Sequence, residues 1–144
     1  MPTANRSRTL KATQAEVWAL IEDPHHLPRW WPGVTRMEGV EAESWTQVFS
    51  TKKGRPVRVD FQLIESHPPW MRSWEQEIEG TPFERVLNES ITVVRLDPVP
   101  DGTAVTIELQ QKLRGYSRTG GLMLRRATGK QLDEALEGLH RIFG

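Results

Sequence analysis

The spacing of apolar and polar residues predicts several β-strands through the middle of the chain. Between residues 57 and 63 every second side chain is apolar, which is typical of a strand with one buried and one solvent-facing side. The same alternation covers residues 70–78 and 103–113, and weaker patterns predict strands over residues 5–12, 37–41, 45–52 and 83–96. Turns rich in Gly and Pro separate these segments, so neighbouring strands are expected to pair antiparallel.

Helical spacing occurs near the beginning and at the end of the chain. The sequence from Thr13 to Glu16 has the form of a capping box, which predicts a helix that starts there and stops at Asp23, before Pro24. Residues 117–143 carry an apolar stripe at helical spacing. A helix of about 25 residues is roughly 38 Å long, whereas an eight-residue strand spans only about 26 Å. A sheet that covers this helix must therefore curl around it.

The connector DPHHLPRWWPGV joins the first helix to the second strand. Pro28 suits the first turn of a second short helix, and Pro32 with Gly33 suits the turn that follows. The two Trp residues have a different role in this interpretation. We expect Trp31 to face an internal cavity and Trp30 to pack nearer the surface.

Together these elements predict an α+β fold in a single domain over residues 1–144. Seven strands form a curved antiparallel sheet that wraps around the long C-terminal helix, and two short helices lie between the first and second strands. Because a strongly bent sheet around one helix leaves a gap wherever the two diverge, and the short elements can close one end of that gap, this arrangement predicts an elongated internal cavity.

Composition narrows the classes of partner. Lys and Arg together number 19 and so do Asp and Glu, so the usual basic footprint of nucleic-acid binding is missing. The chain contains no Cys, which excludes disulfides and thiolate zinc sites and suits a reducing compartment. No apolar run reaches membrane-spanning length. We expect a cytoplasmic protein with a small hydrophobic ligand, no nucleic-acid partner and no integral membrane association; the oligomeric state is left open.

Several segments resemble a known superfamily in their order. They are the entry TLKATQAEVWALIEDPHHLPRWWPGV, the GRPV turn, the PPW break and the stretch LDPVPDGTAVTIELQQKLRG before the long helix. In this order the chain resembles the helix-grip superfamily known as SRPBCC, which includes START lipid-transfer domains, pollen-allergen-like binders and the polyketide cyclase/dehydrase group. The resemblance implies the helix-grip fold with a cavity, and it leaves the activity open because this fold serves many functions.

The residues predicted to contact a ligand combine aromatic and apolar side chains with a few hydrogen-bonding groups: Trp30, Trp31, Phe61, Trp70, Arg72, Trp74, Asn88, Thr92, Leu124 and Thr128. Arg72 shares a strand face with Trp70 and Trp74, where its guanidinium can bind a carboxylate or carbonyl and stack on a ring. The alternative is that Arg72 pairs with a neighbouring Glu on an exposed face.

No metal site or cofactor is predicted. His25 and His26 are adjacent, and successive side chains diverge too far to share one ion. Catalytic residues cannot be assigned, because the sequence contains neither a nucleophile elbow nor a phosphate-binding loop.

Three functions remain open on the sequence. The first is the binding or transport of a small hydrophobic or amphipathic ligand, lipid-like or polyketide-like, in the internal cavity. The second is a polyketide cyclase/aromatase or dehydratase-type enzyme that uses the same cavity. The third is a protein-interaction module related to the chaperone activators of the superfamily.

Overall fold

The computed structural model describes residues 3–51, 53–115 and 118–144, with the side chains of residues 118–125 excepted. The described residues form seven strands and three helices in the order β1 Thr3–Leu10, α1 Gln14–Ile21, α2 Leu27–Trp30, β2 Val34–Glu38, β3 Ser44–Ser50, β4 Pro56–His67, β5 Met71–Gln76, β6 Leu87–Val99, β7 Gly102–Leu113 and α3 Arg118–Phe143. Two short 3-10 turns, η1 Pro24–His26 and η2 Pro82–Arg85, precede α2 and β6.

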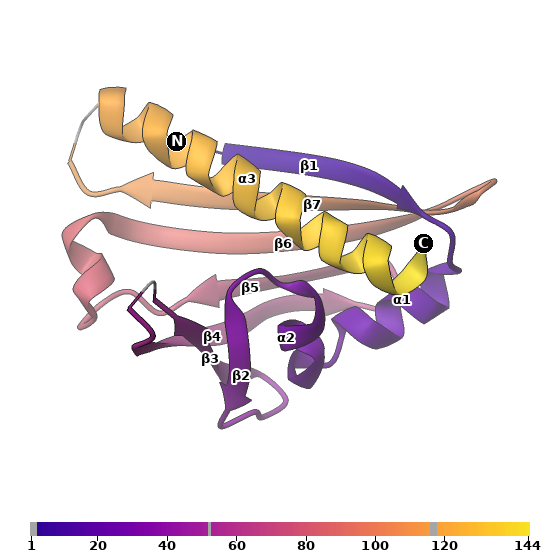
Figure 1. Cartoon of the computed structure of the whole chain (residues 1–144), viewed down its shortest axis with the longest axis horizontal. Helices are drawn as coiled ribbons and strands as arrows, with labels where there is room; N and C mark the ends of the chain where they lie inside the picture. Colours follow the sequence, from indigo (N-terminus) through magenta and orange to yellow (C-terminus); the bar gives the residue numbers. More distant parts are fainter. Residues whose placement is uncertain (1–2, 52, 116–117) are drawn as a thin grey trace.

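All seven strands form one antiparallel sheet in the order β1-β7-β6-β5-β4-β3-β2. The polar strand β1 pairs with β7 and lies at one edge of the sheet. Figure 1 shows α3 lying across one face of the sheet, with α1 and α2 near the end of that face where the C-terminus lies. This is the predicted helix-grip arrangement.

The first helix begins where the capping box predicts. Thr13 Oγ1 accepts a hydrogen bond from the Glu16 amide at 3.2 Å, and Glu16 Oε1 accepts one from the Thr13 amide at 3.3 Å. Asp23 then caps η1, because its side chain accepts the His25 amide at 3.0 Å. These caps set the course of the connector, which leads to Trp30 and Trp31 beside α3.

The core lies between α3 and the inner face of the sheet. Alternate residues of β7, namely Val105, Ile107 and Leu109, are buried there together with Leu132 and Leu139 of α3. No helix in the described ranges combines the length and the apolar character needed to cross a membrane.

Two expected strands differ most in where they begin, while those expected over residues 5–12, 45–52 and 70–78 differ by only one or two residues at each end. The second strand occupies residues 34–38 rather than 37–41, because Gly39 takes a positive φ of 54° and starts the turn into β3. The strand expected over residues 83–96 begins only at Leu87. Thr81 caps the preceding turn by accepting the Phe83 amide at 3.2 Å, and Pro82 at its first position favours the turn over an extended strand.

Candidate ligand-binding pocket

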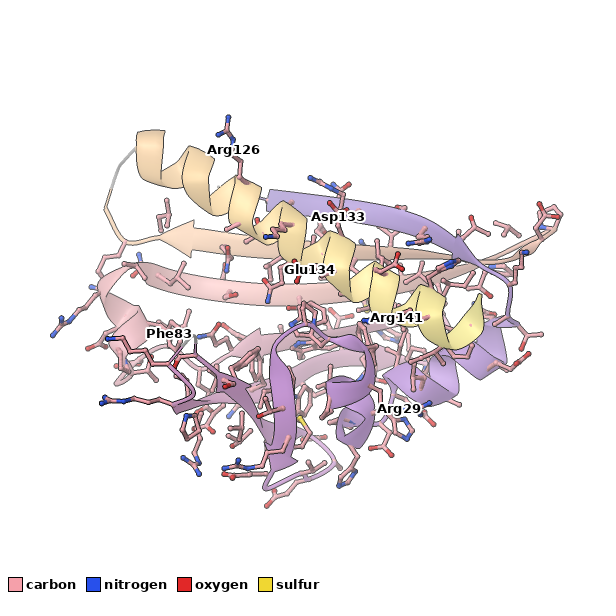
Figure 2. The ribbon with its side chains drawn as sticks, viewed as in Figure 1. Arg29, Phe83, Arg126, Asp133, Glu134 and Arg141 are labelled. Carbon is pink, nitrogen blue, oxygen red and sulfur yellow. The ribbon has the colours of Figure 1, made fainter. Side chains whose placement is uncertain are left out.

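A pocket of about 320 Å³ lies between the curved sheet and α3. Its lining combines aromatic, aliphatic, amide and hydroxyl side chains: Trp31, Gln47, Phe49, Val57, Val59, Phe61, Trp74, Gln76, Phe83, Ser90, Thr92, Leu109, Gln111 and Gln131. Figure 2 shows Phe83 on η2, at the end of the sheet away from α1. Ligand pockets commonly measure about 300–1,000 Å³, so this one suits a small molecule.

An aromatic cluster forms one wall of the pocket. Trp31 and Trp74 meet edge to face with ring centroids 6.3 Å apart, and Trp74 meets Trp45 in the same way at 6.1 Å. Phe61 stacks on Trp45 with centroids 6.4 Å apart and an interplanar angle of 14°. Of these rings, Trp31, Trp74 and Phe61 line the pocket, and Trp45 supports them from behind. The cluster therefore presents flat apolar surfaces to any molecule inside.

Polar side chains occupy inward positions on three strands around this wall. Gln47 on β3 is buried, and so are Ser90 and Thr92 on β6 and Gln111 on β7. Ser90 and Gln111 are directly opposite each other, and Gln111 Nε2 donates a hydrogen bond to Ser90 Oγ at 3.2 Å. The pocket can therefore form hydrogen bonds as well as apolar contacts.

Arg72 lies outside the pocket lining, against the predicted placement. Its side chain is only 6% exposed, and its Cζ lies 5.7 Å from the centroid of the Trp45 ring. Nη1 donates a long hydrogen bond of 3.4 Å to Ser66 Oγ. Burial lowers the pKa of Arg72, while Glu22 and Asp23 act in the opposite direction. The expected stacking thus occurs on Trp45, and the alternative of an exposed pairing with Glu is wrong because Arg72 is buried.

Trp31, Phe61, Trp74 and Thr92, all predicted from sequence, line the pocket together. Trp30 does not; it is buried below α3 at 2% exposure, so its expected position nearer the surface is wrong. Contact of these side chains with a ligand stays a prediction.

Trp70 and Asn88 also lie outside the pocket. Trp70 is 48% exposed and stacks on His67 with centroids 5.5 Å apart, because it belongs to the turn before β5 and escapes the alternation of that strand. Asn88 falls at a register shift between Leu87 and Glu89, where the extra residue turns outward.

The last two predicted residues lie on α3. Thr128 is buried and is not part of the pocket lining. Leu124 falls outside the part of the chain whose side chains are described.

The residues predicted from sequence include none of the amide side chains that line the pocket. Gln111 continues the buried row of Val105, Ile107 and Leu109, and Gln47 continues the row that Trp45 begins. A polar residue in phase with an apolar row is the signal that points to such positions. For Gln47 this signal could be read only once the phase of β3 was known.

The two His side chains that precede α2 lie beside Asp23, the residue that caps η1. His25 Nδ1 lies 2.8 Å from Asp23 Oδ1, and His26 Nε2 lies 3.9 Å from Asp23 Oδ2. Burial alone would raise the pKa of Asp23, but the hydrogen bonds from His25 outweigh it and hold that pKa below its ordinary range. Within the described residues, no three His, Cys, Asp or Glu side chains gather closely enough to hold a metal ion.

Trp31 also borders an outer groove between the α2–β2 connector and α3. Arg29, Trp30 and Val34 line one side of this groove, and Glu134 and Arg141 line the other. Figure 2 shows Arg29 on α2 and both Glu134 and Arg141 on α3. Trp31 therefore stands between the charged outer groove and the inner pocket.

Comparisons with known proteins agree with this architecture. The family model described as "Polyketide cyclase / dehydrase and lipid transport" matches residues 1–144. A START superfamily protein from Mycobacterium smegmatis superposes with a TM-score of 0.78 at 11% identity, covering 98% of this chain and 96% of that chain. A conserved protein from Geobacillus kaustophilus gives 0.77 at 19% identity, covering 96% and 93%. No sequence among curated proteins matches significantly.

Proposed function

The chain belongs to the polyketide cyclase/dehydrase and lipid transport family, and we propose that it binds and carries a small hydrophobic or amphipathic molecule in the inner pocket. The observation that supports this proposal is the pocket itself, where the rings of Trp31, Trp74 and Phe61 form an apolar wall beside buried hydrogen-bonding groups. Burial of apolar ligand surface there favours binding by roughly 25 cal/mol per Å², less the cost of ordering the ligand.

Carriage is favoured over catalysis by the chemistry of the lining. A cyclase or dehydratase needs a group that moves a proton or polarises a carbonyl in the reacting molecule. None of the described lining residues has a side chain that titrates near neutral pH, and Arg72 lies behind Trp45. Amide and hydroxyl groups can orient a bound molecule, which is what a carrier requires.

Native mass spectrometry of the protein purified from its own host tests the proposal. We expect a complex with one bound small molecule of a few hundred daltons, roughly the mass that such a pocket holds. The bound mass should disappear after denaturation, and the released compound can then be identified. Ligand-free protein in every preparation, together with no binding in a panel of hydrophobic compounds, would reject the carrier function.

A further inference from the structure

Gln47 is a buried amide whose hydrogen-bonding capacity is unused by the described residues. Its side chain is 2% exposed and lines the pocket from β3, opposite Val59 of β4. None of the described residues forms a hydrogen bond with its amide oxygen or nitrogen. The amide has no described protein partner and opens into the pocket, so only water or a ligand there can complete its hydrogen bonds. A ligand that carries a matching donor and acceptor can take this place.

The position of Gln47 on β3 turns its amide toward the pocket. It lies in the inward row of β3 between Trp45 and Phe49, a row where an apolar side chain would complete the wall. Its carboxamide carries both a donor and an acceptor on one planar group. The best partner for such a group is another amide, which offers the same pair in reverse order.

Gln111 on β7 lies on another part of the wall and is already engaged, because its Nε2 donates to Ser90 Oγ at 3.2 Å. Three strands, β4, β5 and β6, separate β3 from β7 in the sheet, and the pocket lies in the concavity between them. The amide of Gln47 therefore stands apart from the engaged pair, and both sets of polar groups border the same aromatic wall.

The lining also disfavours a charged ligand. All described lining residues are uncharged. The buried cation Arg72 lies outside the lining, with its guanidinium over the ring of Trp45. A carboxylate taken into this pocket would lose its hydration without gaining a described counter-charge, which is costly. The free energy needed to move an uncharged polar group from water into the pocket is much smaller.

We propose that the pocket selects an uncharged, planar molecule that carries a carboxamide or lactam group, with that group paired to Gln47 and its rings packed on Trp31 and Trp74. This inference rests on the proposed function and adds the chemical class of the ligand. The volume of about 320 Å³ accommodates a molecule of two or three fused rings.

Three compounds of one shape test the selection. They are 2-naphthamide, which has the paired donor and acceptor, 2-methylnaphthalene, which has neither, and 2-naphthoate, which is an anion. Affinities are measured by isothermal titration calorimetry, with the hydrocarbon measured by competition against the amide. The wild-type chain is compared with Gln47→Leu and with the control Gln62→Leu on the outer face of β4, where Gln62 Nε2 donates to Glu77.

We expect the wild-type protein to bind 2-naphthamide about tenfold more tightly than either other compound, in line with one well-made hydrogen-bonding pair. Gln47→Leu should remove the preference for 2-naphthamide over 2-methylnaphthalene, and Gln62→Leu should keep it. Equal or tighter binding of 2-naphthoate by the wild type, or a preference over 2-methylnaphthalene that survives Gln47→Leu, would overturn the inference. If none of the three binds although a compound co-purifies from the host, the inference fails and the carrier function stands; if nothing co-purifies either, both fail.

Discussion

At the scale of single residues, Trp31 is expected to contribute both to the stability of the fold and to ligand affinity. It is only 7% exposed, packs edge to face on Trp30 and Trp74, and faces both the pocket and the outer groove. We expect Trp31→Ala to lower the free energy of unfolding by about 3 kcal/mol, the low end for a core aromatic residue, since part of the ring faces the pocket. Ligand affinity should fall about tenfold or more as the ring contact is lost.

Trp30→Ala is the matched control for that substitution. Trp30 is buried below α3 without lining the inner pocket, so its removal should cost about 3–5 kcal/mol of stability and change affinity less. Chemical denaturation gives the stabilities, and calorimetry with 2-naphthamide gives the affinities. If Trp31→Ala unfolds the protein outright, the connector is a structural corner and no part of a ligand site.

The sequence could predict those positions that follow a strand's alternation without interruption. Phe61 and Trp74 are such positions, and both line the pocket. Asn88 and Trp70 were misplaced because a register shift and a turn interrupt the alternation next to them, and the register shift at Asn88 has no strong local signal. Gln47 was missed because its inward phase depends on how β3 pairs with β4.

At the scale of elements, the contact between α3 and the connector depends on a glycine. A Cβ atom added to Gly138 would lie 2.9 Å from Trp30 Cα and still closer to its carbonyl oxygen. Because this neighbour is backbone, Gly138→Ala should force the helix away and destabilise the protein by about 1–2 kcal/mol, even though Ala favours helix formation.

Gly129→Ala, on the same helix, provides the contrast. A Cβ atom there would meet only Arg6 Nη2, at 2.5 Å, which is the end of a flexible side chain. This variant should be neutral or more stable by up to about 1 kcal/mol, the gain in helix propensity. Thermal unfolding of the two variants measures the difference, and equal destabilisation of both would argue against close packing of Gly138 on Trp30.

Ion pairs fix α3 to the edge strand β1. Arg8 Nη1 donates to Glu137 Oε2 at 2.6 Å, and Arg6 Nε lies 3.3 Å from Asp133 Oδ1. The hydrogen bond from Arg8 holds the pKa of Glu137 below its ordinary range, with the charges of His140 and Arg141 acting the same way. A carboxyl group with a lowered pKa stabilises the fold above its unfolded pKa, and this contribution is lost as the pH falls through the folded value.

Glu137→Gln should therefore be less stable than the wild type at neutral pH, and the difference should shrink below the ordinary Glu pKa of about 4.3 and vanish below the lowered pKa of the folded state. Urea denaturation at a series of pH values measures it. Glu134→Gln is the control, because no described residue forms an ion pair with Glu134. A difference between wild type and Glu137→Gln that persists unchanged in acid would show that the pair contributes nothing through its charge.

The helices and strands were largely predictable from periodicity, because apolar residues recur every second position in a half-buried strand and every three or four positions in a helix. The capping box located α1, and the apolar stripe located α3. The boundaries of β2 and β6 were not predictable, because the turns at Gly39 and Thr81 determine them and their geometry is set by local caps.

At the scale of the whole molecule, the long helix and the curved sheet diverge enough to leave the inner pocket. The buried residues Leu132, Ala135, Leu136 and Leu139 bind the later part of α3 to the core. Gln131 lies one position before this stretch and already lines the pocket. Figure 1 shows the same diagonal course of α3 over the sheet. The sequence predicted a cavity from this mismatch of lengths, and it could not predict which polar groups face it.

The most direct test of ligand binding in this pocket uses the indole N–H resonances of the six Trp residues. The ¹⁵N-labelled protein is titrated with the compound recovered from the host preparation, or with 2-naphthamide. The signals of Trp31 and Trp74 should shift in proportion to occupancy, because both rings line the pocket. Those of Trp18, which donates to Glu22, and of the exposed Trp70 should stay in place. Shifts confined to Trp70, with Trp31 and Trp74 unmoved, would place the ligand on the outer surface and contradict the account.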